Sequence, residues 1–168
     1  MIRQARTTYA VCVTRPFVRG RDSLRKLVRR DGAEWCQDAL DVLVYAGQQI
    51  CLGDTVVRRY SPAALSSSSR AVRSLSPTES SSSRAVFDVY RSDSREVRYT
   101  TDSGVVRVAS LALDLDEAED VDRSGTTSST STSVVELRAS FGGEELRLCA
   151  VDTVTGRAAR TTVPFACQ

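Results

Sequence analysis

The most informative absence in this sequence is histidine, since none of its 168 residues is one. Histidine is the commonest general acid and base in enzymes, and it completes the Ser-His-Asp and Cys-His arrangements. Without it, a zinc site built from cysteine and histidine is excluded. Glycine-rich phosphate-binding loops followed by Lys-Ser or Lys-Thr are missing too. The sequence therefore predicts a binding or interaction protein, not an enzyme, and no metal.

Lysine is nearly absent as well, because Lys26 is the only one. The positive charge is carried by arginine and gathers early in the chain, at Arg15, Arg19, Arg21, Arg25, Arg29 and Arg30. The net charge is only +2, and no aromatic platform accompanies the cluster, so nucleic acid is not an expected partner. Two interpretations stay open: a solvated basic face, or a surface in the Arg-rich N-terminal third that holds an acidic protein partner through bidentate hydrogen bonds.

Paired cysteine spacings and long apolar runs are also missing. The five cysteines are odd in number and never form C-x-x-C, which favours reduced thiols. No apolar run approaches the roughly 20 residues of a membrane span. The N-terminus has arginines but lacks the apolar core of a secretory signal. We expect a cytoplasmic protein with no membrane partner.

What the sequence does contain is alternation of apolar and polar residues. Near the end of the chain, one predicted strand face consists of Val135, Leu137, Ala139 and Phe141, and the next consists of Leu146, Leu148 and Ala150. Ala159, Thr161, Val163 and Phe165 predict a third strand after a turn over Asp152 to Gly156. Gly142-Gly143 is interpreted as a two-residue hairpin turn with positive φ angles.

Shorter β-prone runs precede this meander. Thr8 to Val13 predicts a strand that stops at Arg15-Pro16, and Ile50 to Tyr60 predicts two pieces broken at Gly53-Asp54. Further ordered segments are expected at Phe87 to Tyr90, Glu96 to Thr100 and Val105 to Leu115. Leu24 to Val28 fits a strand or one helical turn, and residues 35–45 fit a strand or a short helix. Together these predict a mainly β fold, a sandwich of two antiparallel sheets.

Two Ser-rich tracts interrupt the pattern. The heptapeptide SSSSRAV occurs at residues 66–72 and again at 80–86, which indicates a small tandem duplication. We expect disordered inserts at about 65–84 and 118–133 within a single domain of residues 1–168. The acidic run DLDEAEDVD lacks the spacing of a calcium loop and is interpreted as solvated.

Two sets of residues carry a family resemblance. The order FGGEELRLCAVDTVTG, residues 141–156, resembles the end of the substrate-binding β-domain of the 70-kDa heat-shock chaperones, with one extra residue after the glycine. Upstream, RDGAEWCQD (30–38) and LGDTVVRRYSPA (52–63) resemble the atypical heat shock 70 kDa protein 12A/12B branch of that family. The resemblance covers roughly Thr8 to Phe165.

The resemblance implies a two-sheet β-sandwich that binds unfolded or extended apolar polypeptide clients. Main-chain hydrogen bonds and pockets for alternate side chains suit such a ligand. It points to five peptide-binding residues, Val11, Val13, Tyr60, Ala63 and Phe87, with core packing as the open alternative for each. Trp35 and Cys36 have no counterpart in the ordinary chaperones, and we interpret them as packing residues.

The family pattern is incomplete in this sequence. We find no nucleotide-binding domain and no helical lid, so ATP is expected only for an intact family member, and this chain is expected to be a fragment, a partial gene model or a degenerate paralogue that uses no cofactor. The resemblance implies that the Ser-rich insert, between Ala63 and Phe87, falls in the loop that arches over the peptide channel, where ordering a long loop costs entropy. An alternative to chaperone-type binding is a pseudo-chaperone that contacts an acidic partner through its Arg-rich face.

Overall fold

The computed structural model describes residues 2–65, 83–115 and 134–166. Within these ranges every regular element longer than three residues is a β-strand. The two Ser-rich inserts lie almost wholly outside the described residues, as does the acidic run beyond Leu115. Only the edges of the first insert are described: Leu65 follows a short 3-10 helix, and Ser83 and Arg84 begin a strand.

The larger of the two main sheets is antiparallel and has the strand order β3-β4-β2-β7-β8. Its strands are β2 (Thr8–Pro16), β3 (Leu27–Arg30), β4 (Ala33–Val44), β7 (Ser83–Ser92) and β8 (Val106–Leu115). The 3-10 helix η1 (Leu24–Lys26) leads directly into β3. The central strand β2 is buried on both faces from Thr8 to Thr14, which is why TYAVCVT contains no charged residue.

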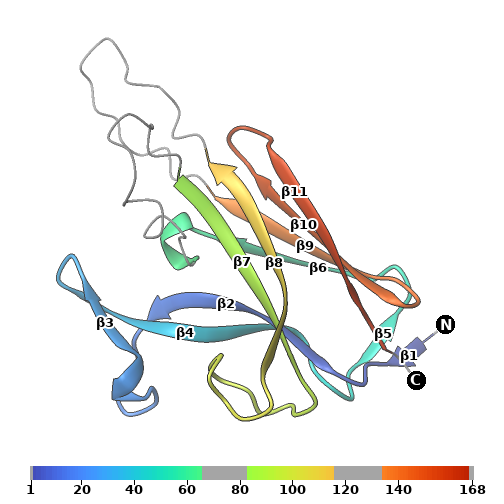
Figure 1. The fold of residues 1–168 in the computed structure, drawn as a ribbon, viewed down its shortest axis with the longest axis horizontal. Coiled ribbons are helices and arrows are strands. Elements are labelled where there is room, and N and C mark those ends of the chain that lie inside the picture. Colours follow the sequence, from blue (N-terminus) through green and yellow to red (C-terminus); the bar gives the residue numbers. More distant parts are fainter. Residues whose placement is uncertain (1, 66–82, 116–133, 167–168) are drawn as a thin grey trace.

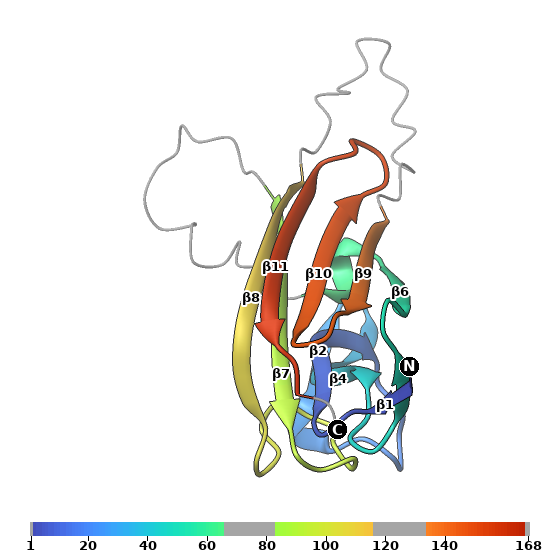
Figure 2. The ribbon, with the colours of Figure 1, turned by 90° about the vertical axis from the view of Figure 1, so that its right-hand side faces the viewer.

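The second main sheet is antiparallel with the order β11-β10-β9-β6. Its strands are β6 (Thr55–Tyr60), β9 (Val135–Phe141), β10 (Glu145–Asp152) and β11 (Ala158–Pro164). The 3-10 helix η2 (Pro62–Ala64) follows β6. Figure 2 shows this sheet stacked on the larger one, with β11 beside β8 at one side of the sandwich. The predicted sandwich of two antiparallel sheets is confirmed.

A small third sheet pairs β1 (Ile2–Gln4) with β5 (Gln49–Cys51). It lies at the right-hand end of the molecule in Figure 1, where residues 2 and 166 are also found. The Arg6 amide donates to the Ala166 carbonyl at 3.2 Å. The opposite end carries η1, β3 and η2 (Figure 1).

The core between the main sheets is built from the alternating residues of both. Leu111, Leu113 and Leu115 are buried as predicted, and so are the inward faces of β9 and β10. Phe165 packs on Tyr9 and on Phe141, with ring centroids 5.6 and 5.3 Å apart. Because Tyr9 belongs to β2 and Phe141 to β9, this contact joins the two sheets.

The hairpin between β9 and β10 differs from its prediction. Phe141 pairs with Leu146, so the connection has four residues, and neither Gly142 nor Gly143 has a positive φ angle. Gly142 is favoured instead by close approach: a Cβ there would lie 3.1 Å from the Glu145 carbonyl oxygen, which accepts a hydrogen bond from the Gly142 amide. The turn that does use positive φ is the next one, at Gly156 (φ +76°).

The structure decides the ambiguous segments. Residues 24–28 combine both alternatives, a 3-10 turn followed by the start of β3, and residues 35–45 lie almost wholly in β4. Glu96 to Thr100, expected to be regular, contributes only an isolated bridge from Tyr99 to Ala39. Tyr99 is buried there although the segment does not form a strand.

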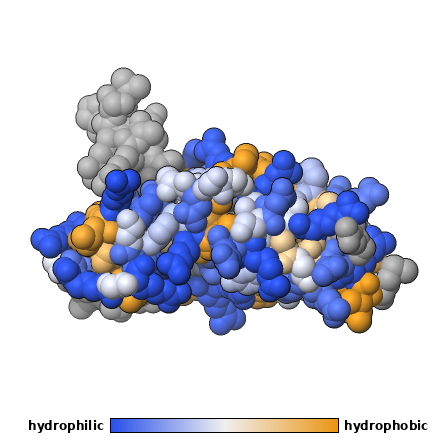
Figure 3. Space-filling model, turned by 90° about the horizontal axis from the view of Figure 1, so that it is seen from below, coloured by the Kyte–Doolittle hydropathy of each residue, from blue (hydrophilic) through white to orange (hydrophobic). Residues whose placement is uncertain are grey.

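One face of the molecule is mostly polar. Figure 3 shows this face, on which hydrophilic side chains surround small, separate apolar patches. Among residues 2–65, 83–115 and 134–166, no helix has the length and apolar composition to cross a membrane.

Candidate peptide-binding region

The candidate region is the end of the sandwich where β2 separates from β7. The two strands are paired only from Thr8 to Val11 of β2, and Val13 then forms a single bridge to Leu65. Leu65 follows η2, which lies between the diverging strands in Figure 1. Beyond Val11, the edge of β2 is therefore covered by one residue of an irregular segment instead of by a strand.

Four of the five predicted site residues lie in the core beneath this segment. Val11 and Phe87 are fully buried, while Val13 and Tyr60 retain 6% and 9% exposure. The rings of Tyr60 and Phe87 meet edge to face with their centroids 5.6 Å apart. All four belong to one hydrophobic cluster together with Leu65. Ala63 is separate from them, since it is exposed on η2.

The Tyr60 side chain is fixed by its hydroxyl as well as by its ring. The hydroxyl donates to Asp41 Oδ2 at 2.5 Å, across the gap between β6 and β4. Burial, with Asp41 as the second cause, raises the pKa of Tyr60 well above its usual range. Arg58 joins the group, with Nη2 donating to the Val42 carbonyl at 3.5 Å. These contacts close the β6–β4 side of the sandwich.

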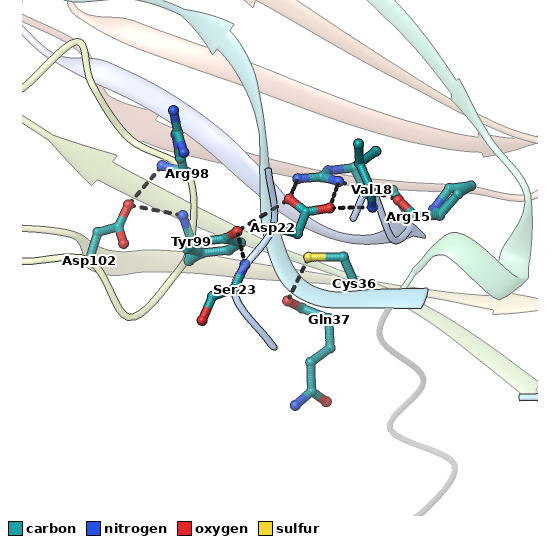
Figure 4. A network of polar contacts seen from close by, with 10 residues as sticks. Arg15, Val18, Asp22, Ser23, Cys36, Gln37, Arg98, Tyr99 and Asp102 are labelled. Atoms are coloured by element: carbon teal, nitrogen blue, oxygen red, sulfur yellow. Dashed lines mark hydrogen bonds and ion pairs between the residues drawn. The ribbon is translucent and has the colours of Figure 1, made fainter. Parts of the chain in front are cut away.

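Beside the region, the connection between β2 and β3 is held by a polar network around Asp22 (Figure 4). Arg15 donates two hydrogen bonds to the Asp22 carboxylate, both at 2.7 Å, and the Val18 amide adds a third at 2.8 Å. The Tyr99 hydroxyl donates to the same carboxylate at 3.2 Å and accepts from the Ser23 amide at 3.1 Å. The Asp22 side chain is only 1% exposed.

The network keeps Asp22 ionised. The hydrogen bonds from Arg15 are the largest cause that lowers the pKa of this carboxyl far below its usual range, and they outweigh the opposing effect of burial. Tyr99 is in turn fixed because its amide and that of Arg98 donate to Asp102 Oδ2. The network therefore ties the β2–β3 connection to the connection between β7 and β8.

Sequence reasoning missed this network. Asp22 was one acidic residue in a basic stretch, and its partner Tyr99 lies 77 residues away in the chain. The only available signals were an acidic residue enclosed by arginines and an aromatic residue in a polar segment, and neither indicates a contact between them.

The described residues offer little else that indicates a ligand. None of their cysteine, aspartate and glutamate side chains form a group of three or more that could hold a metal ion. An open hollow of about 510 Å³ is lined by Glu96, Val97, Arg98 and Asp102, and of its two carboxylates Asp102 is already engaged by backbone amides. The arrangement provides apolar burial and main-chain pairing at the end of β2.

Comparisons with known proteins name a family. Heat shock 70 kDa protein 12B of Homo sapiens is 32% identical over 166 residues, which cover 98% of this chain and 22% of that protein. Heat shock 70 kDa proteins 12A of Mus musculus and of Homo sapiens are each 29% identical over 164 residues, covering 98% of this chain and 21% of theirs. The chain spans about a fifth of the length of these relatives. No family model and no solved structure matches it.

Proposed function

From the relationship of this chain to the heat shock 70 kDa proteins 12A and 12B, which confirms the predicted resemblance, we propose that it is a non-catalytic β-domain that binds extended apolar polypeptide segments. The observation that carries the proposal is this relationship over 98% of the chain. The proposal assigns no cofactor to the described residues. It includes a cytoplasmic location, which the free thiols of Cys12, Cys36, Cys51 and Cys149 favour.

The proposed binding mode is strand addition at the end of β2. Pairing between β2 and β7 stops at Val11, so the main chain of β2 beyond this residue is available to an extended peptide once the Leu65 bridge opens. Leu65 is itself an apolar residue in extended conformation (φ −100°, ψ 147°), so it resembles such a ligand. A client would take its place beside Val13.

This mode gives the five predicted residues different roles. Val11 and Phe87 are fully buried, so they support the site from below instead of contacting a client directly. Val13 becomes available when Leu65 moves away, and Ala63 stands at the rim on η2. Tyr60 lies at the base of the site, where its ring packs on Phe87 and its hydroxyl donates a hydrogen bond to Asp41.

Fluorescence anisotropy with a labelled extended apolar peptide tests the proposal. We expect micromolar binding that survives moderate salt, because apolar burial is not screened. Ala63→Glu places a charge at the rim and should weaken binding at least about five-fold, which corresponds to roughly 1 kcal/mol.

Ala158→Glu is the matched control, since Ala158 is also exposed but lies on β11. It should leave the affinity unchanged. Equal effects of the two substitutions, or no binding of the peptide by the wild-type chain at micromolar concentrations, would contradict the proposal.

A further inference from the structure

Positive charge is concentrated beside the proposed peptide site. Residues 17–32, which connect β2 to β4 through η1 and β3, contain six basic and two acidic residues, whereas the whole chain has a net charge of only +2. We call the exposed side chains of Arg19, Arg21, Arg25, Arg29 and Arg30 the basic face, although Arg29 and Arg30, as neighbours on β3, point to opposite sides of its sheet.

Most donors of the basic face are unused within the described residues. Among these five arginines only Arg19 forms hydrogen bonds to a described carboxylate, since its Nε and Nη2 donate to both oxygens of Glu34 at 3.0 and 2.6 Å. Arg29 is 3.7 Å from the same carboxylate, beyond hydrogen-bond distance, and its side chain is 73% exposed. Arg21, Arg25 and Arg30 contact no acidic group in the part of the chain that the structure describes.

The connection has three other charged groups, Asp22, Lys26 and Asp31. Asp31 is exposed next to Arg30 and offsets one of the five exposed positive charges. Asp22 is turned inward, and its carboxylate is engaged by Arg15, Val18 and Tyr99. Lys26 is also occupied, with Nζ 3.3 Å from Asp38 and 5.6 Å from the centre of the Tyr99 ring. The charge that remains exposed on the connection is therefore mainly that of arginine.

The backbone that carries these arginines is ordered by the Asp22 network (Figure 4). The Arg21 and Asp22 amides both donate to the Val18 carbonyl, and the Ser23 amide donates to Tyr99. A preorganised cationic surface loses less entropy when it binds an anion than a mobile one does. Leu24 and Val18, 71% and 45% exposed, add apolar area between the arginines.

The basic face also lies where a bound segment would continue. The connection begins at Phe17, four residues after Val13, and a strand advances about 3.3 Å per residue, so it starts about 13 Å along β2 from the Leu65 bridge. In Figure 1, η1, β3 and η2 share one end of the molecule. A peptide held beside Val13 and running along β2 would pass onto this surface.

We propose that the basic face selects, among apolar segments, those that carry acidic residues on the flank lying beyond the end of β2. This inference rests on the proposed function and names its substrate class. Arginine forks bind carboxylates bidentately, and the donors of Arg21, Arg25 and Arg30 are available for this. Basic flanks are disfavoured at this position by like charge.

Four peptides test the inference with the full chain: an apolar or a Gly-Ser core, each with an acidic or a neutral flank on both sides. At low salt we expect the acidic flank to tighten binding of the apolar core about five-fold, as two or three exposed ion pairs would. The preference should disappear by about 1 M salt, where screening acts within roughly 3 Å.

The paired variants are Arg21→Gln/Arg25→Gln and Arg91→Gln/Arg160→Gln. Both remove two exposed arginines and change the net charge equally, but the second pair lies on β7 and β11. We expect the first to lose the flank preference while keeping its affinity for the neutral-flanked apolar peptide, and the second to keep the preference.

Each outcome has a distinct meaning. Equal affinity for acidic and neutral flanks, or equal loss of preference in both variants, would overturn the inference and leave the proposed function standing. Binding of the acidic Gly-Ser peptide alone would support the basic face and refute the proposed apolar site. Binding of no peptide would refute both.

Discussion

Asp22 shows how one buried charge organises the candidate region. Its carboxylate accepts hydrogen bonds from the Arg15 guanidinium, the Val18 amide and the Tyr99 hydroxyl. These hydrogen bonds offset the free-energy cost of burying the charge. Removal of the charge leaves Arg15, whose side chain is 36% exposed, without its anionic partner. Substitution of Asp22 therefore affects every hydrogen bond that the carboxylate accepts.

Asp22→Asn should lower the free energy of unfolding by about 2 kcal/mol, since hydrogen bonds to charged groups contribute about 1.5–3 kcal/mol. Urea unfolding measures it. Glu34→Gln is the control: its partner Arg19 is 67% exposed, so we expect a change within about 0.5 kcal/mol.

The difference in stability between wild type and Asp22→Asn should depend on pH. The folded-state pKa of Asp22 is depressed below the unfolded value of about 4, so its ionised form stabilises the fold above that pH, and the stabilisation is lost as the pH falls toward the folded-state pKa. The difference between wild type and Asp22→Asn should be constant from about pH 7 to 5 and shrink below about pH 4. A difference that grew in acid would contradict the network.

The described cysteines should divide into reactive and protected thiols. Cys51 is exposed, whereas Cys12 and Cys36 are buried. Burial raises the pKa of Cys12 to about 12, with Asp38 a further cause, and burial also raises the pKa of Cys36. A thiol reagent at pH 8 followed by mass spectrometry should label Cys51 within minutes and Cys12 and Cys36 only on unfolding. Labelling of Cys12 at the rate of Cys51 would show that β2 is open in solution.

At the scale of elements, the β9–β10 hairpin separates two roles of glycine. A Cβ at Gly142 would meet the Glu145 carbonyl oxygen at 3.1 Å, and the hydrogen bond between these residues resists adjustment. A Cβ at Gly143 would have no atom within 4 Å, and neither residue has a positive φ angle. A comparison of Gly142 with Gly143 therefore measures the effect of a close steric contact without a contribution from a positive φ angle.

Gly142→Ala should lower the free energy of unfolding by about 0.5–1 kcal/mol, because the steric cost exceeds the gain from a less flexible unfolded chain. Gly143→Ala should raise it by about 0.5 kcal/mol through that gain alone. Thermal unfolding measures both. Equal effects would mean that the hairpin adjusts freely.

At the scale of the molecule, both main sheets share one core. Phe165, just after β11, packs on Tyr9 of β2 and Phe141 of β9, and the Tyr9 hydroxyl donates to the Pro164 carbonyl at 2.6 Å. The sandwich should therefore unfold as one cooperative unit. Trp35, the only tryptophan, reports on β4 in the larger sheet.

Phe165→Ala should destabilise the chain by about 3–4 kcal/mol. The midpoints of Trp35 fluorescence and far-UV circular dichroism should fall together, although Phe165 and Trp35 belong to different parts of the sandwich. Val154→Ala, at a 58% exposed position, should change neither. A shift in circular dichroism alone would show that the sheets unfold independently.

Much of the fold could be predicted because alternation is local. Leu111, Leu113 and Leu115 specify an inward face by their spacing alone, and the same holds for β9 and β10. The prediction failed where conformation depends on a neighbour: at Gly142, where a carbonyl approaches, and at residues 96–100, which bridge to β4 without forming a strand.

The candidate site was predictable only in part. Val11, Val13, Tyr60 and Phe87 were identified through the family resemblance, and the structure brings them into one cluster, but their burial could not be read from the chain. Burial of Val13 depends on Leu65, more than 50 residues away, and that of Phe87 on the opposite sheet.

The sequence by itself determined most strands of the second sheet, the two-sheet class and the resemblance to the heat shock 70 kDa proteins 12A and 12B, since periodicity and motif are properties of neighbouring residues. Only the tertiary structure decided which charges are used. The six basic residues in 17–32 cannot be told apart from sequence alone. In the folded chain Lys26 pairs with Asp38 and Arg19 pairs with Glu34. The side chains of Arg21, Arg25 and Arg30 remain exposed. The reason is physical: an ion pair needs two groups within about 4 Å, and residues distant in the chain meet only when the sheets pack.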